Sequence, residues 1–251
     1  MIALELCLQT ETNLAANVSL AREFGVARLE LCSRMDLSGL TPSPAEVAVA
    51  RQHWGDGPGL VAMLRPRGGD FCYDAAEVAL LRQHMAQLAA AGADSVVLGL
   101  LTAEHQLHQS AIRELVEFAA VLGLTVAFHR AIDASADPAL SWLQLSRLGV
   151  ARVLSAGTPW HSQLPANQGI AQLQAFLAAG GPELVIGGGV NAGNIGAIRA
   201  QLPEGSAYSF HLHSAVQRQG RLQADLLQAV FTQLSCPLSS PLSSPLSCQP
   251  G

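Results

Sequence analysis

The sequence predicts an α/β protein built as a single (β/α)8 barrel, the fold also called a TIM barrel. Three observations lead to this prediction. Eight short apolar segments are bounded by turn residues, stretches of helical periodicity separate them, and the alternation runs along a chain of 251 residues. A doubly wound sheet usually needs fewer strands, whereas eight strand-helix units in about 250 residues are typical of the barrel.

The predicted strands are short and rich in Val, Ile and Leu. They cover residues 2–8, 27–32, 59–65, 95–101, 125–132, 151–156, 183–190 and 207–213. Between the third and fourth strands, apolar residues recur on one helical face: Val78, Leu81, Met85 and Leu88. Several helical segments stop at a glycine just before the next strand, as a left-handed C′ residue favours: Gly25, Gly92, Gly123, Gly149 and Gly180.

The barrel is expected to occupy residues 1–234 as one domain. From Ser235 onward the chain changes to SCPLSSPLSSPLSCQPG, a Pro/Ser/Leu repeat that suits neither a helix nor a strand ladder. We therefore expect residues 235–251 to form a disordered low-complexity tail.

The composition restricts the possible partners. The chain has 14 basic and 19 acidic residues, a formal net charge of −5 and no basic run, so we expect neither nucleic acid nor a membrane as partner. The N-terminus has no signal-peptide pattern, which predicts a cytoplasmic protein. Five cysteines, an odd number, predict free thiols rather than a disulfide framework. A small molecule or an ion is the expected ligand.

Side-chain alternation predicts which residues face the barrel interior. The tetrapeptide LELC occurs in each of the first two strands, and its leucines are expected to pack under the helices. The same parity turns Glu5 and Cys7 inward in the first strand, and Glu30 and Cys32 inward in the second. Buried carboxylates are costly, so these acids need partners such as Arg65 or water. Alternatively, Glu5 and Arg65 form a purely structural ion pair.

Other strands add polar side chains at the same end of the predicted barrel. Arg65 and Arg67 follow the interior parity of the third strand, and His129 ends the fifth. In the eighth strand either His211 or His213 can be the pocket histidine. Polar residues at the C-terminal ends of several strands mark the position of barrel active sites.

Two loops suggest an anionic ligand. The segment MLRPRGGDFCYD places Arg65, Arg67 and Asp70 beside a Gly-Gly pair, where guanidinium and backbone N–H groups can converge on an anion. After the seventh strand, Gly188 and Gly189 belong to a glycine loop in the region where many barrels bind phosphate.

The stretches VARLELCS, SGLTPS, LRPRGGDFCY, FHRAID, ARVLSAG and GGGV, in this order, resemble the CutC family of copper homeostasis proteins. The resemblance covers nearly the whole chain up to the tail, and RPRGGDFCY is its most specific motif. It implies a TIM barrel, cytosolic copper handling, copper bound through cysteine, and self-association into a homo-oligomer.

Carried over residue by residue, the resemblance implies a set of pocket positions. They are Glu5, Glu30, Arg65, Arg67, Asp70, His129, Arg130 and Asp133, and Cys7, Cys32 and Cys72 also lie in the family's motifs. The chain departs from the family at the eighth strand, where Ser209 replaces a glutamate and His211 is followed by a second histidine.

Two functions are therefore expected as alternatives. In the first, Cys7 and Cys32 offer thiolates from adjacent strands to copper(I), a soft ion that prefers sulfur; the competing interpretation is that they are ordinary apolar core residues. In the second, the barrel is an enzyme for a small anionic or phosphorylated metabolite. There Glu5, Glu30, His129 or Asp133 acts as general acid or base, and arginines and the glycine loop bind the anion. A third possibility is a polar interior that is only structural.

Overall fold

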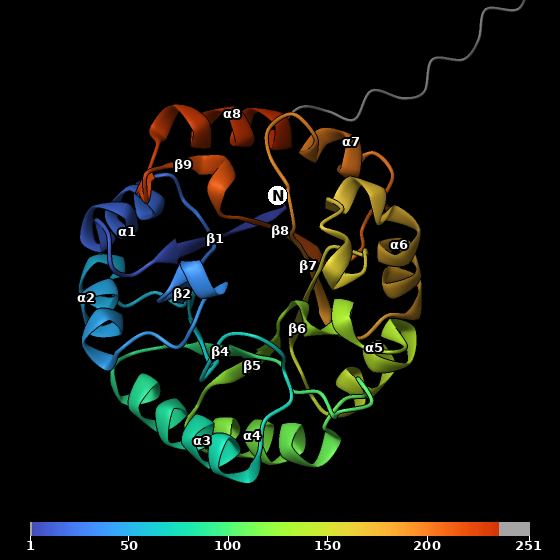
Figure 1. The fold of residues 1–251 in the computed structure, drawn as a ribbon. Coiled ribbons are helices and arrows are strands. Elements are labelled where there is room, and N and C mark those ends of the chain that lie inside the picture. The colour runs from blue at the N-terminus through green and yellow to red at the C-terminus, as the bar shows by residue number, and fades with distance from the viewer. Residues whose placement is uncertain (1, 236–251) are drawn as a thin grey trace, which may run out of the picture.

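The computed structural model describes residues 2–235, and in this range the chain forms a closed barrel of eight parallel strands in sequence order (Figure 1). The strands are β1 Ala3–Gln9, β2 Arg28–Cys32, β3 Leu60–Met63, β4 Ser95–Leu98, β5 Thr125–Phe128, β6 Arg152–Ser155, β7 Glu183–Ile186 and β8 Tyr208–Leu212. Parallel pairing of β1 with β8 closes the ring. The predicted (β/α)8 barrel is confirmed.

Helices surround the strands on the outside of the barrel (Figure 1). They are α1 Leu14–Glu23, α2 Pro44–Trp54, α3 Ala75–Ala90, α4 Gln109–Val121, α5 Pro138–Arg147, α6 Ile170–Ala179, α7 Ile195–Arg199 and α8 Ala224–Ser235. Five 3-10 turns lie in the loops: η1 Met35–Leu37, η2 Arg130–Ala134, η3 Trp160–Ser162, η4 Ala166–Gln168 and η5 Ser214–Val216. A short hairpin of β9 Gln217–Arg218 and β10 Arg221–Leu222 follows β8. No helix among the described residues has both the length and the apolar character needed to cross a membrane.

The main apolar core lies between the strands and the helices. Leu4, Leu6 and Leu8 of β1 are buried there, together with Leu29 and Leu31 of β2. The leucines of both LELC segments therefore face outward, as the parity predicted. The five glycines expected at helix ends all have positive φ angles, between 66° and 100°.

A separate, smaller apolar cluster fills the middle of the barrel. Its members are Cys7, Cys32, Val61, Met63, Val97 and Ala127, with Met35 packed against it. Glu5 and Glu30 come from the same inward-facing rows and are 4% and 3% exposed. The barrel interior thus combines a sulfur-rich apolar cluster with buried carboxyl groups.

Several predicted strands end earlier than the sequence indicated, and the released residues form the loops of the site. β3 ends at Met63, because the backbone N–H of Arg65 donates to Thr41 Oγ1 rather than to a neighbouring strand. β5 ends at Phe128, and Arg130 begins η2. At the C-terminus Ser235 closes α8, and the rest of the predicted tail, 236–251, lies outside the described residues.

Candidate functional site

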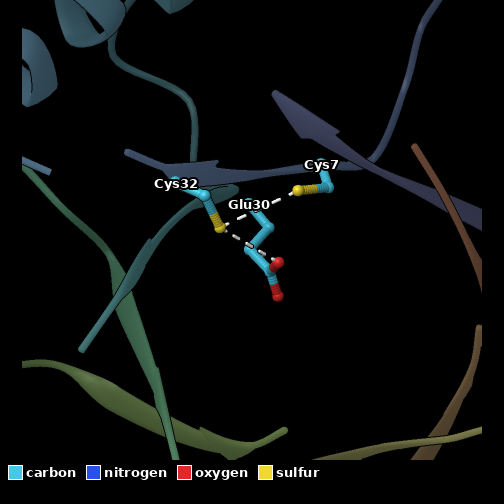
Figure 2. A group of neighbouring side chains, drawn as sticks. All are labelled: Cys7, Glu30 and Cys32. Carbon is cyan, nitrogen blue, oxygen red and sulfur yellow. Dashed lines mark hydrogen bonds between the residues drawn. The ribbon is translucent and has the colours of Figure 1, made fainter. Parts of the chain in front are cut away.

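Two cysteines and a glutamate meet in the upper half of the barrel interior. Cys7 lies opposite Glu30 in the pairing of β1 with β2, and Cys32 follows two residues later on the same face of β2. The Cys7 and Cys32 Sγ atoms are 3.8 Å apart, and Cys32 Sγ donates to Glu30 Oε1 at 3.4 Å. Figure 2 shows the three side chains pointing toward one another from the two strands. The sequence predicted this convergence.

A network of charged groups lies directly beneath the thiols. Arg28 Nε donates to Glu5 Oε2 at 2.9 Å, and Arg28 Nη2 donates to both Glu183 Oε1 and Ser209 Oγ at 2.6 Å. His211 Nδ1 pairs with Glu5 Oε1 at 2.8 Å. The buried Glu5 carboxylate is therefore fully engaged.

The expected pairing of Glu5 with Arg65 is wrong. Strand register places Glu5 opposite Arg28 and His211, whereas Arg65 follows the end of β3. Arg65 is four residues beyond Val61, the partner of Glu30, and a strand rises ~3.3 Å per residue, so it sits well above the carboxylates. Its guanidinium instead donates to the backbone oxygens of Leu37, Ser38, Gly39 and Gly69.

The local charges divide the two acids into different protonation states. Burial opposes ionisation of Glu5, but His211 and Arg28 outweigh it and lower the pKa of Glu5 to about 2. Burial raises the pKa of Glu30 to about 8, with only partial compensation from His211. Burial also disfavours the charged form of His211, yet Glu30, Cys7 and Glu5 raise its pKa. At neutral pH, Glu5 is thus a carboxylate, Glu30 a carboxylic acid and His211 an imidazolium.

The pKa values of the two thiols are also shifted in opposite directions. The contact between the two sulfurs lowers the pKa of the Cys7 thiol against the effect of burial, and His211 and His213 add to this. The same contact, together with burial, raises the pKa of Cys32. The pair therefore favours a thiolate at Cys7 beside a protonated Cys32.

A cavity of about 450 Å³ opens above these groups at the C-terminal ends of the strands. Its lining includes Cys7, Glu30, Cys32, Met35, Met63 and His211. It also includes Arg65, Phe71, His129, Arg130, Trp160 and Gly188. Gly189 and His213 also line it, so both histidines of β8 and its following turn reach the cavity. The predicted residues from six strands or their loops are brought together here.

Arg67 and Asp70 lie outside the lining of this cavity. Arg67 donates to Asp70 Oδ1 at 2.8 Å, to Glu77 Oε1 at 2.5 Å and to the backbone oxygen of Cys72 at 2.7 Å. The interior parity expected for Arg67 is wrong because the chain has already left the strand at Met63. Through these contacts Arg67 stabilises the conformation of the RPRGGDFCY loop.

Arg130 and Asp133 form a fixed pair at the start of η2. Arg130 Nε donates to Asp133 Oδ2 at 2.7 Å, and the guanidinium lies over the Trp160 ring, 5.0 Å from its centroid. Asp133 accepts further hydrogen bonds from Ser155 Oγ and from the Ala156 backbone N–H. The carboxylate that the sequence proposed as an acid or base therefore positions the arginine.

Sequence reasoning missed Arg28, Met35, Met63 as a site residue, and Trp160. Arg28 could have been found, because it shares the inward parity of Glu30 and Cys32 on one strand. Met35 and Trp160 lie in 3-10 turns outside the periodic segments, and no pattern in the sequence places such turns over the cavity.

The fold and this cavity define a TIM-barrel protein with a thiol-containing site at the C-terminal ends of its strands, where barrel proteins bind their ligands. The model of the CutC family matches residues 2–208, and the chain belongs to this family.

Individual relatives agree with this assignment. The chain is 42% identical over 182 residues to a family protein CutC from Xanthomonas campestris pv. campestris, a match covering 72% of each chain. It is 40% identical over 179 residues to a family protein CutC from Vibrio campbellii, covering 70% of each. Among solved structures, the putative copper homeostasis protein CutC from Streptococcus agalactiae superposes with a TM-score of 0.73 at 29% identity, covering 84% of this chain and 98% of that one.

Proposed function

We propose that this protein binds copper(I) in copper homeostasis, with the ion held between Cys7 and Cys32. The observation that carries the proposal is the pair of buried thiols from adjacent strands, 3.8 Å apart. With metal–sulfur distances of ~2.3 Å, two sulfurs at this separation subtend about 110° at a shared ion. This angle supports the binding of one ion by both sulfur atoms.

The surroundings of the thiols support a soft ion. Thiolate and thioether sulfur select copper(I), and the thioethers of Met35 and Met63 pack against the two cysteines. The depressed pKa of Cys7 favours the thiolate, which is the form that binds metal. A cytoplasmic location, which keeps thiols reduced, is part of the same proposal.

An anaerobic copper(I) titration against a competing chromophoric chelator tests the site. Cys236 and Cys248 lie outside the described residues, so both are replaced by serine in every sample to remove their sulfur. In this background we expect one tight copper(I) ion per chain, lost in Cys7→Ser/Cys32→Ser and retained in Cys72→Ser. Cys72 is the matched control, because its Sγ donates to a backbone oxygen outside the cavity. Equal affinity in all three proteins contradicts the proposal.

Native mass spectrometry of the same samples measures the oligomeric state together with the bound metal. The family resemblance predicts a homo-oligomer, and the intact mass reports both the number of chains and the metal bound to each.

A second candidate function is an enzyme for a small anionic metabolite, and one observation favours it. A volume of about 450 Å³ falls within the ~300–1,000 Å³ typical of small-molecule sites and exceeds the needs of a single ion. The acids and bases around it have strongly shifted pKa values, as catalytic groups do. Small molecules that co-purify with the full chain, identified by mass spectrometry, test this candidate. Protein isolated with no such molecule, and stabilised by none in a metabolite library, argues against it.

A further inference from the structure

One wall of the cavity carries hydrogen-bond donors that have no partner within residues 2–235. This wall, hereafter the anion wall, consists of Arg65, Phe71, His129, Arg130 and Gly188. Its residues lie in the segments after β3, β5 and β7, whereas the thiols come from β1 and β2. In the closed strand order β5 lies across the ring from β1 (Figure 1). His129 and Arg130, which follow β5, therefore lie across the cavity from Cys7.

His129 is fixed as a neutral donor. Its Nδ1 accepts the backbone N–H of Ala131 at 3.1 Å, so the single proton of the neutral ring resides on Nε2. Burial, together with the charge of Arg65, lowers the pKa of His129 to about 3 and keeps the ring neutral. The residue is 5% exposed, lines the cavity, and its Nε2 has no hydrogen-bond partner among the described residues. A buried N–H donor without a partner costs free energy, so a ligand atom that accepts its hydrogen bond would stabilise it.

Arg130 offers a second set of donors beside it. Its Nε is held by Asp133 and its plane lies over Trp160, which fixes the direction of the guanidinium. Its two terminal nitrogens have no hydrogen-bond partner within residues 2–235. Gly188 keeps the adjacent space open, because a Cβ there would lie 3.3 Å from Arg130 Nη1 and 2.9 Å from the Ala156 side chain.

The charge of the anion wall has a definite sign. The charge of Arg130 is balanced by Asp133, but among the described residues the Arg65 guanidinium donates to backbone oxygens and pairs with no carboxylate. Its buried Nε also has no partner in the described part of the chain. The Phe71 ring joins these groups, with its centroid 4.9 Å from that of His129 and 5.1 Å from the Arg65 guanidinium carbon. The wall is thus cationic, rigid and rich in N–H donors.

We propose that the anion wall binds the anionic oxygens of a small molecule, a carboxylate or a phosphate, with Arg130 as the fork and the His129 Nε2–H as a neutral donor. A guanidinium with two free nitrogens matches both groups bidentately. This proposal extends the enzymatic candidate and rests on it only for the existence of an anionic ligand. It does not depend on whether copper binds to the thiols.

The first test needs no variant. In the metal-free full chain, long-range 1H–15N spectra of the imidazoles are recorded during titration with inorganic phosphate or with acetate. We expect the His129 signals of a neutral ring protonated on Nε2, and a shift of these signals with one of the two anions. The responding anion identifies the phosphate or carboxylate class. No response of the His129 ring to either anion at millimolar concentration overturns the proposal.

Three variants then test the roles of individual residues by calorimetry with the responding anion. Arg130→Gln is expected to weaken binding about 10- to 100-fold, the loss of a charged hydrogen-bond pair. His129→Asn keeps the acceptor for Ala131 but lacks a donor at Nε2, and should also weaken binding, whereas His129→Gln can place an amide N–H there and restores part of it.

Arg82→Gln is the control, because Arg82 pairs with the exposed Glu114 and lies outside the cavity lining. Affinity that is equal in wild type, Arg130→Gln and His129→Asn overturns the proposal. Anion binding that depends on Arg130, in a protein with which no small molecule co-purifies and which no metabolite in the library stabilises, supports the anion wall and argues against the enzymatic candidate.

Discussion

The buried His129 ring should make the folded protein sensitive to mild acid. An unfolded histidine titrates near pH 6.5, whereas burial and the charge of Arg65 lower the pKa of His129 to about 3 in the folded chain. Between these values the unfolded state binds a proton that the folded state cannot bind, so acidification favours unfolding. The contribution of His129 to stability is complete above pH 6.5 and is lost progressively as the pH falls toward 3.

The two pKa values set the size of this effect. Lowering the pH from 7.5 to 5 costs about 2 kcal/mol of unfolding free energy through this group, from the proton-linkage relation. Each further pH unit costs about 1.4 kcal/mol until the folded-state pKa is reached. Arg65 is the ionisable group that acts on the ring through its charge.

Other groups in the cavity also titrate, so a matched variant isolates this contribution. His129→Asn retains an oxygen near the position of Nδ1 that can accept the Ala131 N–H, and it does not titrate. Urea denaturation of both proteins at several pH values gives the free energy of unfolding at each. We expect the wild type to lose about 2 kcal/mol more than the variant between pH 7.5 and pH 5. Parallel curves for the two proteins would refute a buried neutral His129.

Two further pairs of substitutions test the packing of the site by the same urea denaturation at neutral pH. Gly99→Ala should destabilise the fold by about 1–3 kcal/mol, because its Cβ would lie 2.2 Å from His129 Cε1, whereas Gly57→Ala, with open space around it, should have little effect. Arg28→Met removes the guanidinium that pairs with both the buried Glu5 and Glu183, and should cost about 3–5 kcal/mol. In Arg82→Met the lost ion pair is exposed and should cost less than about 1 kcal/mol. Equal effects within either pair would contradict the contacts described.

The sequence was sufficient for the fold and for the orientation of the side chains in the two LELC segments. A strand has a side-chain period of two, so the leucines of the two LELC segments alone determine that Glu5, Cys7, Glu30 and Cys32 face inward. The glycines before the strands likewise follow from a local backbone requirement. Both inferences depend only on neighbours in the chain, which is why they are confirmed.

The partner of each polar group could not be predicted in this way. Partners depend on strand register, and a barrel strand can be shifted along its neighbour without changing its own pattern. Arg65 was therefore expected beside Glu5, although the register supplies Arg28 and His211. Loop geometry could not be predicted either. The turn after Met63 carries Arg67 away from the cavity, whereas Arg130 in η2 lines it.

Register also decides which groups remain available to a metal ion. Two sets of side chains have ligand atoms within 4.8 Å of one another: Cys7, Glu30 and Cys32, and Glu5, Glu30 and His211. In the second set the Glu5 carboxylate already accepts from Arg28 and His211, so a cation there must break existing charge pairs.

Within residues 2–235 no arginine pairs with either thiol. The thiols contact each other and Glu30, and an ion that binds both must displace the proton of Cys32. Hard cations prefer carboxylate oxygen, but the Glu5 carboxylate already pairs with Arg28 and His211. The donors left for an incoming ion are sulfur, and for this reason the copper(I) proposal rests on Cys7 and Cys32 rather than on the carboxylates beside them.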